Sequence, residues 1–363
     1  MSAISQSLSR RLRVITAITA KDLLDALKNK TTLGVILPAL FILIFYRFIP
    51  QISGHDDLTT LYVYDPSGGG AVMLLEDSLD LDVREVASPA DVKVSVANGD
   101  VPEVGIVLPE DFDPEAGTTL NLNAYTIYWL SEVQRAETVQ TVQGEVSFLL
   151  DRPVNLIVDG NLVYHEVDSD GLGFLASISI VFVLVMIGIS FLPNLMLEEH
   201  KEDTMQLLQV SPASPSDIII AKALTGMFYA LIMSAGAWIL YWQVFVNPFI
   251  TAGTFLIGSL LFVLAGLLLG GVVKNRQQLM LIGWVIILPL LLPPFMEIMD
   301  DIMPLGLLRV IRFIPSVSLA RMLRSSMNIQ PDWAFYVGQM VYLLTFVVIL
   351  FVLNMISIRR RDR

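Results

Sequence analysis

The sequence has no cysteine among its 363 residues, which excludes disulfides, thiolate nucleophiles and cysteine metal sites. It also lacks a G-x-x-x-x-G-K-[ST] loop, so it has no P-loop to hold the phosphates of ATP. The nucleophile pattern G-x-S-x-G is absent, and the run from His165 to Asp168 reads H-E-V-D rather than the zinc pattern H-E-x-x-H. The sequence therefore predicts no catalytic residue, no metal site and no cofactor in this chain.

The sequence is rich in apolar residues, with 54% hydrophobic residues and a mean hydropathy of +0.66. These values indicate an integral membrane protein. None of the apolar runs carries Asp, Glu or His near its middle, although ion-coupled carriers usually depend on such groups, so secondary transport is disfavoured. Six runs are long enough to cross a hydrocarbon core of roughly 30 Å as helices: Leu33–Ile49, Gly171–Leu197, Ile218–Tyr241, Phe255–Val273, Leu279–Phe295 and Trp333–Ile358.

Charge divides the chain into two parts. Residues 51–170 hold 23 acidic and 4 basic residues, net −19, which leaves 12 acidic and 19 basic residues, net +7, for the remainder. Six basic residues precede the first apolar run, and Lys274, Arg276 and the C-terminal arginines flank later ones. The positive-inside rule therefore places both termini in the cytoplasm and the acidic residues 50–170 outside. Four arginines of residues 297–332 lie outside against this rule: Arg309, Arg312, Arg321 and Arg324.

The first 32 residues predict a cytoplasmic amphipathic helix in the plane of the membrane interface. On a helix over residues 8–28, one side carries Leu8, Leu12, Ile15, Thr19, Leu23 and Ala26. Basic residues lie opposite, at Arg10, Arg13, Lys21 and Lys28, while Leu24 falls on the wrong side. Two interpretations are open. The helix is a membrane-surface anchor, or its polar side also helps to seat a cytoplasmic partner.

Residues 50–170 predict a small α+β domain between the first two membrane helices. Strands are expected at 61–64, 104–108 and 120–124, because alternating apolar residues there run into Gly and Pro turns. Residues 131–150 have helical spacing, and this helix is a candidate outward extension of the second membrane helix. The acidic excess indicates a solubilising surface more than a cation site. His165, Glu166 and Asp168 lack the paired spacing of metal ligands.

The segment from Glu198 to Lys222 is a polar hinge between two apolar runs, so it lies at a membrane face. Charged residues come first, followed by the apolar stripe of Met205, Leu207, Leu208 and Val210. Ser211-Pro212 ends this short helix, since proline lacks the amide hydrogen. After a second break at Ser214-Pro215, Ser216 or Asp217 can cap the next helix. The hinge is either a solvated connection or a docking helix for another protein.

The hinge resembles the coupling segment of ABC-2-type permeases, the membrane-spanning subunits of ABC exporters. The resemblance rests on the acidic end of the second membrane helix, the run EDTMQLLQVSP from Glu202, and Lys222. The runs V-Y-D-P-S from Val63 and G-I-V-L-P-E-D-F from Gly105 resemble the large domain of such permeases. Phe313 to Arg321 resembles the re-entrant helices that precede the last membrane helix. Asp203 departs from the pattern, where glycine is more usual.

This resemblance implies contacts with a separate cytoplasmic ATPase, which would hold ATP and magnesium. The coupling contacts would come from Glu198, Glu199, Lys201, Glu202, Asp203, Thr204, Leu207, Leu208, Ser211 and Pro212 within a segment spanning residues 198–217. It also implies a five-helix region over 171–363, pairing with a second permease copy or a paralogue, and residence in the cell membrane. Drugs, lipids, peptides, polysaccharides and sodium all remain possible substrates. A non-transporting receptor or scaffold is the alternative, and a channel independent of an ATPase is a third.

Overall fold

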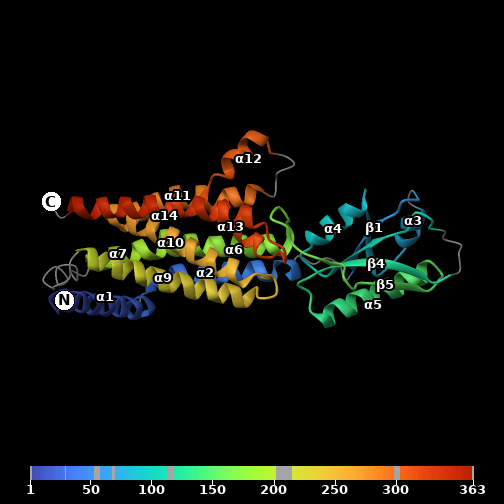
Figure 1. Cartoon of the computed structure of the whole chain (residues 1–363), viewed down its shortest axis with the longest axis horizontal. Helices are drawn as coiled ribbons and strands as arrows, with labels where there is room; N and C mark the ends of the chain where they lie inside the picture. The colour runs from blue at the N-terminus through green and yellow to red at the C-terminus, as the bar shows by residue number, and fades with distance from the viewer. Residues whose placement is uncertain are drawn as a thin grey trace.

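The computed structural model describes residues 2–28, 30–52, 58–67, 70–112, 118–201, 215–297 and 303–361. A bundle of long helices and a sheet domain lie end to end along the long axis of the molecule (Figure 1). Both termini lie at the end of the bundle that is far from the sheet domain. We call this end the terminal end, and we call the end beside the sheet domain the domain end.

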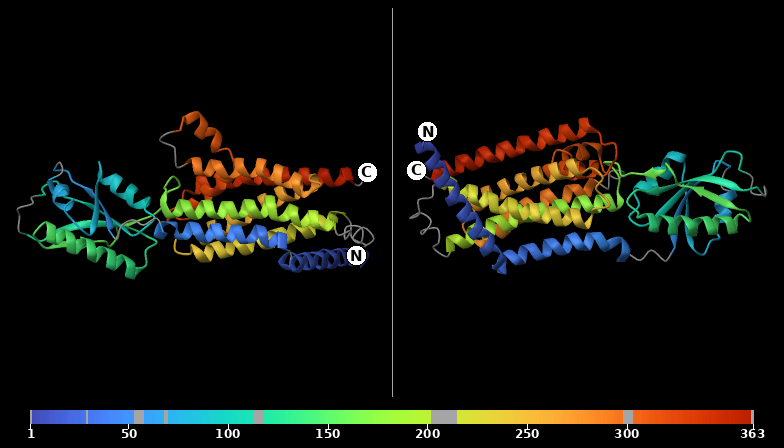
Figure 2. Two further views of the ribbon diagram at one scale, coloured as in Figure 1. Left: turned by 180° about the vertical axis from the view of Figure 1, so that it is seen from behind. Right: turned by 60° about the horizontal axis from the view of Figure 1, so that its bottom comes forward.

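Long helices of the bundle run roughly along the same axis (Figures 1 and 2). The second of the predicted membrane helices is continuous in space but includes a π-helical turn, η1. The bundle comprises α2 (Lys30–Ile52), α6 (Gly171–Met186), η1 (Ile187–Phe191), α7 (Leu192–Lys201), α9 (Pro215–Leu240), α10 (Pro248–Val272), α11 (Arg276–Met296) and α14 (Trp333–Arg361). Helix α1 (Ser2–Lys28) packs beside α9 at the terminal end.

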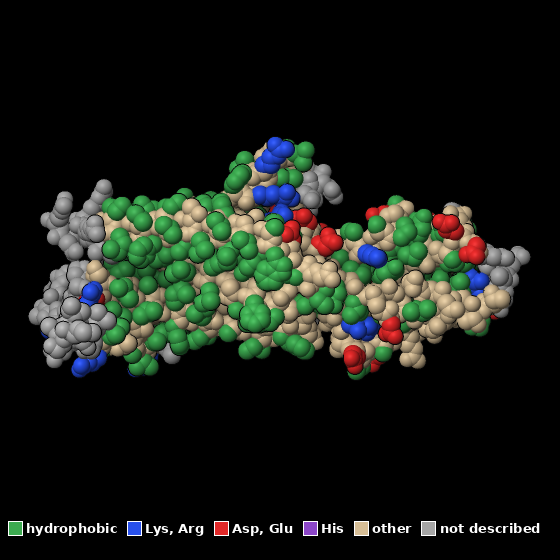
Figure 3. Space-filling model, in the orientation of Figure 1, with side chains coloured by type: hydrophobic (Ala, Val, Ile, Leu, Met, Phe, Trp, Pro, Cys, Tyr) green, Lys and Arg blue, Asp and Glu red, His purple; other side chains and the backbone are tan. Residues whose placement is uncertain are grey.

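Five helices in the described part of the chain are long and apolar enough to cross a membrane. These segments are Gly171–Leu197, Ser216–Leu240, Pro248–Val272, Arg276–Met296 and Trp333–Ser357. Leu33–Ile49 of α2 is a shorter apolar helix, so a sixth crossing stays a prediction. Hydrophobic side chains are spread along the whole visible flank of the bundle (Figure 3). A helical flank of this composition suits a lipid environment, because helices satisfy their backbone hydrogen bonds internally.

Helices α6 and η1 form the centre of the bundle, and glycines allow η1 to touch α10. A Cβ atom on Gly188 would lie 2.3 Å from the Phe262 carbonyl oxygen, and one on Gly266 would lie 1.9 Å from that of Gly188. Within an apolar stretch of 18 residues, 83% of Gly171–Leu197 lies buried in the protein, against 17% for Trp333–Ser357. The second predicted span is therefore the core element, whereas α14 leaves most of its surface to lipid or to another chain.

The sheet domain has six strands in the order β2-β1-β3-β4-β5, with β6 also paired to β4. Strands β1 to β3 are parallel, and β4 runs antiparallel to β3. Helices α4 and α5 cover opposite faces of the sheet (Figure 1). The elements are β1 (Thr59–Tyr64), α3 (Gly70–Leu75), β2 (Leu81–Glu85), α4 (Pro89–Ala97), β3 (Glu103–Val107), β4 (Leu120–Ile127), α5 (Glu132–Leu149), β5 (Val154–Ile157) and β6 (Leu162–Val163).

Helix α5 confirms the predicted helix over residues 131–150. The prediction that this helix extends the second membrane helix was wrong. Its start is fixed by a capping box, in which Ser131 and Gln134 each bond to the other's backbone amide. The chain then turns at Asp151, whose φ is 49°, and Pro153 cannot continue a helix. Strands β5 and β6 intervene before α6 begins at Gly171.

The sheet domain is joined to the bundle by close backbone packing at the start of α6. Gly171 has a φ of 70°, and a Cβ atom there would lie 2.3 Å from the Asn98 carbonyl oxygen. The Asp170 amide donates to Asn98 Oδ1 at 3.1 Å, and the Tyr128 hydroxyl donates to the Val244 carbonyl. Asn328 Nδ2 donates to the His165 carbonyl at 3.3 Å. The junction therefore holds the domain through several separate chain segments.

Residues 303–332 contain two short helices, as the sequence predicts for this region. Helix α12 (Leu305–Ile311) projects from the side of the bundle (Figure 1), whereas α13 (Pro315–Ser325) is buried among α6, α10, α11 and α14. The amides of Val246 and Asn247 both donate to the Ser326 carbonyl, which ties the α9–α10 turn to the end of α13. A polar helix thus occupies the interior at the domain end.

The carboxyl of Glu103 makes the stability of the sheet domain dependent on pH. Burial, followed by the charge of Asp100, raises the pKa of Glu103 from 4.5 to about 7. The folded state therefore binds the proton more tightly than the unfolded state. The contribution of Glu103 to the free energy of unfolding should be greatest below pH 4.5 and fall by about 3 kcal/mol as pH rises to about 7.

The expected signature is faster hydrogen exchange in β1 and β3 at pH 7.5 than at pH 5.5, after correction for intrinsic exchange rates. Glu103→Gln should remove most of this difference, because the amide carries no charge at either pH. Glu76→Gln is the control, since Glu76 is exposed. Equal pH dependence in wild type and Glu103→Gln would contradict the assignment.

Candidate functional site

The predicted coupling segment joins α7 to α9 at the terminal end of the bundle. Glu198, Glu199 and Lys201 belong to the last turn of α7. The other predicted coupling residues lie outside the described residues: Glu202, Asp203, Thr204, Leu207, Leu208, Ser211 and Pro212. Ser216 and Asp217, predicted as caps, fall within the first turn of α9. The structure therefore describes the two helices that flank the segment and the contacts of their ends.

A buried ion pair joins α1 to α9 next to this segment. Lys222 Nζ lies 3.1 Å from Asp22 Oδ2, and the two side chains are only 1% and 2% exposed. Removing two such charges from water costs several kcal/mol per ion, which their attraction offsets only in close, well-bonded geometry. The pair therefore strongly favours one placement of α1 on α9, because separating the helices would break this contact between two buried charges.

A second ion pair of reversed polarity lies nearer the start of both helices. Arg11 of α1 donates to Asp217 Oδ1 of α9 through Nε at 3.0 Å and Nη2 at 2.8 Å. Here α1 supplies the cation, whereas in the pair of Asp22 and Lys222 it supplies the anion. Exchanging the partners would place like charges together. The two pairs therefore select one direction and one register for α1 along α9.

Apolar packing and two neutral hydrogen bonds complete the α1–α9 contact. Ile15 and Ile18 pack with Ile218 and Ala221 in one buried cluster. The Thr19 hydroxyl donates to the Ala221 carbonyl at 3.3 Å, and that of Tyr229 donates to the Leu23 carbonyl at 2.8 Å. Helix α1 is thus a packed part of the bundle, in addition to any contact with a membrane surface.

The residues predicted for the polar side of α1 are exposed and lie away from this contact. Arg10, Arg13, Lys21 and Lys28 are all exposed, and Lys21 approaches Asp25 at 3.9 Å. Leu12, predicted on the apolar side, is 55% exposed, because the side facing α9 is centred on Ile15, Ile18 and Asp22. Sequence reasoning missed the pairing of Asp22 with Lys222. The available signal was a lysine inside an apolar run and an aspartate on a predicted amphipathic helix.

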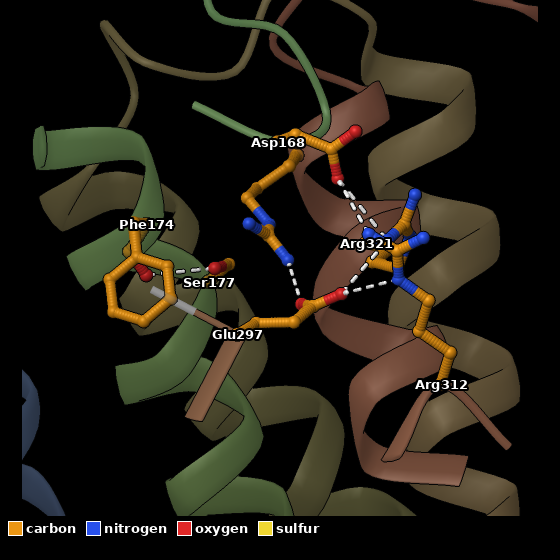
Figure 4. A network of polar contacts seen from close by, with 7 residues as sticks. Asp168, Phe174, Ser177, Glu297, Arg312 and Arg321 are labelled. Carbon is orange, nitrogen blue, oxygen red and sulfur yellow. Dashed lines mark hydrogen bonds and ion pairs between the residues drawn. The ribbon is translucent and has the colours of Figure 1, made fainter. Parts of the chain in front are cut away.

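A network of charged side chains closes the domain end of the bundle (Figure 4). The Glu297 carboxylate, at the end of α11, lies 2.8 Å from Arg321 and 2.5 Å from Arg324, both on α13. Arg312 approaches Glu297 at 3.8 Å, and Arg321 also lies 3.2 Å from Asp168. Asp168 belongs to the connector between the sheet domain and α6. The network therefore links the domain, α11 and α13.

This network contains three of the four arginines whose predicted external position departs from the positive-inside rule. Arg324 is 3% exposed, and its guanidinium carbon also lies 5.5 Å from the centre of the Phe174 ring. Buried arginine of this kind requires a carboxylate, which Glu297 supplies. Arg312 and Arg321 share Glu297 and Asp168. Each of these three positive charges therefore has a carboxylate partner in the structure.

His165 lies between the network and the sheet domain as a neutral side chain. Burial, and less strongly the charge of Arg324, lowers the pKa of its imidazole to about 4, so it carries no charge at pH 7. Its ring meets that of Tyr128 edge-on at 5.7 Å. Within the described residues, no group of three or more His, Asp and Glu side chains is placed to hold a metal ion. The geometry assigns His165 to packing at the junction.

Neutralising Lys222 tests the α1–α9 ion pair. Lys222→Met should destabilise the α1–α9 contact by about 3–5 kcal/mol, because Asp22 loses its ammonium partner. The double variant Asp22→Leu with Lys222→Met should be closer to wild type than Lys222→Met alone. Limited proteolysis within α1 and hydrogen exchange of α1 measure the effect. Additive losses in the double variant would contradict direct pairing.

Neutralising Glu297 tests the network at the domain end. Glu297→Gln removes the negative charge of the carboxylate that Arg321 and Arg324 share. Hydrogen exchange in α12 and α13 should therefore become faster, and the melting temperature should fall. Glu137→Gln on the exposed surface of α5 is the matched control and should leave both unchanged. Identical exchange of α13 in the two variants would show that Glu297 does not hold this helix.

Comparison with known families agrees with this architecture. The sequence model described as ABC-2 family transporter protein matches residues 30–356, which include the whole sheet domain and nearly all of the bundle. No curated protein shows significant similarity to the chain. A match over this length, on a structure with five helices suited to crossing a membrane, covers the greater part of the protein. The chain belongs to the ABC-2 family of transporter proteins.

Proposed function

We propose that the chain is the permease subunit of an ABC exporter and couples ATP hydrolysis by a separate cytoplasmic ATPase to substrate export. The observation that carries the proposal is the family match across residues 30–356. The sequence has no P-loop, so the ATPase with its ATP and magnesium is assigned to a partner chain. A second permease copy or a paralogue would complete the transport path.

The distribution of charged residues supports a chain in the cell membrane whose terminal end faces the cytoplasm and whose sheet domain lies outside. The terminal end carries the exposed cations of α1, and Lys274 and Arg276 lie at the turn between α10 and α11. The acidic excess of residues 51–170 lies in and around the sheet domain. An even number of crossings, with α2 as the sixth, agrees with both termini lying at one end of the bundle (Figure 1).

The contacts of α1 and α9 support a route from the ATPase into the bundle. The predicted coupling segment starts in the last turn of α7 and leads into α9, so a displacement of this segment by a moving ATPase acts first on those two helices. Helix α1 moves together with α9. If α1 kept its position while α9 moved, Asp22 and Lys222 would have to separate in a buried environment. The moving unit is therefore α1 with α9, which shifts the bundle between inward-open and outward-open states.

Affinity purification from the native membrane tests this proposal. The chain should carry with it a protein with a P-loop, and ATP hydrolysis by that complex should depend on the permease. Combined substitution Glu202→Ala and Leu207→Ala in the coupling segment should remove most of the co-purifying ATPase, because these residues supply its predicted contact.

The matched control is Glu137→Ala, on exposed α5 of the sheet domain, which should retain the ATPase. A stable complex that contains no ATPase, or an ATPase that binds the double variant as well as wild type, would contradict the exporter. A partner bound through the sheet domain alone would favour the receptor or scaffold alternative.

A further inference from the structure

A cleft lies at the junction of the sheet domain and the bundle. Its volume is about 430 Å³, within the range of roughly 300–1,000 Å³ that is usual for small-molecule sites. One wall comes from α4, another from β4, β6 and the residues after β6, and the third from residues 328–330 after α13. The proposed coupling to an ATPase makes no use of this cleft.

The walls offer hydrogen-bonding groups for which the described residues supply no partner. Asn98 accepts from the Asp170 amide through Oδ1, so its Nδ2 group remains available, and Asn161 donates through Nδ2 to Ile157, which leaves Oδ1. Gln330 is exposed and lines the cleft. Amide groups can both donate and accept, so a cleft lined by them suits a ligand whose own groups do both.

Aromatic and aliphatic surface accompanies these amides. Tyr125 and Tyr164 line the cleft, and the ring of Tyr164 stacks on Tyr128 at 4.7 Å, which fixes its orientation. Val94, 55% exposed, and Ile329, 56% exposed, add apolar contact area. Flat rings beside polar groups favour a ligand that has apolar C–H faces as well as polar edges.

The charged residues around the cleft favour neither an anionic nor a cationic ligand. Lys93 Nζ lies 5.0 Å from the centre of the Tyr125 ring, and Glu166 and Asp168 are the acidic residues that line the cleft. Asp168 is already paired with Arg321 at 3.2 Å. One cation and one further anion remain, so the net charge offered to a ligand is close to zero. An extended peptide fits less well, because β6 has only two residues to pair with an added strand.

We propose that this cleft binds a neutral polyhydroxylated ligand, a short oligosaccharide, between α4 and residues 328–330. Hydroxyl groups of the sugar would bond to Asn98, Asn161 and Gln330, and its C–H faces would pack on Tyr125 and Tyr164. Asp168 lines the cleft and also belongs to the Glu297 network. A ligand that contacts Asp168 would therefore affect the ion pairs of α13, which packs inside the bundle.

The experiment measures sugar binding directly on the full-length protein in nanodiscs. Maltotriose, cellotriose and the trimer of N-acetylglucosamine are used as separate probes in saturation-transfer NMR, with tetra-alanine as a peptide probe. Val94→Trp should fill the cleft and reduce transfer to the bound sugar by about tenfold or more. Val133→Trp is the matched control, since Val133 is an exposed valine on α5, which covers the other face of the sheet.

The site is supported if wild type and Val133→Trp bind at least one of the sugars and Val94→Trp loses that binding. Gln330→Ala, which removes one exposed amide without disturbing a buried group, should weaken the same sugar several-fold. The absence of transfer to all three sugars overturns the proposal, as does equal transfer in all variants or binding of the peptide alone. These outcomes do not depend on an ATPase, so they are distinct from failure of the proposed exporter function.

Discussion

The buried ion pair of Asp22 and Lys222 is the interaction on which the terminal end of the bundle depends. Both side chains are almost fully removed from solvent, so separating the two charges inside the protein is costly. The pair of Arg11 and Asp217 has the reverse polarity and sets the register. Together they convert an amphipathic helix that could lie anywhere on a membrane surface into a fixed neighbour of α9.

Buried ion pairs also fix the helices at the domain end, in a different arrangement. Glu297 compensates two arginines of α13, and Asp168 extends the network to the connector of the sheet domain. Between the two ends, the bundle is held by apolar packing around α6 and by the close approach of Gly188 and Gly266. Buried charges therefore specify the position of the helices at their ends, where apolar side chains alone would allow sliding.

The sequence predicts the long elements well because their signals are local. Five apolar runs correspond to helices suited to crossing a membrane, and the strand expected at 61–64 is β1. Strand β2 was missed because only Leu81 of its five residues is buried. The ion pairs were missed for another reason: Asp22 and Lys222 are 200 residues apart, and Arg11 and Asp217 are 206 apart. No local pattern records such partners, and the coupling contacts of residues 198–212 stay a prediction.

The most direct test asks whether α1 and α9 move as one unit. The chain has no cysteine, so spin labels can be attached specifically through Lys21→Cys on α1 and Leu224→Cys on α9, both exposed positions. The distance between the two labels is measured by double electron–electron resonance in the complex with its ATPase, with and without ATP. If α1 and α9 move as one unit, the distance distribution should be narrow and the same in both states. A distribution that broadens or lengthens on addition of ATP would show that α1 separates from α9 and would contradict this prediction.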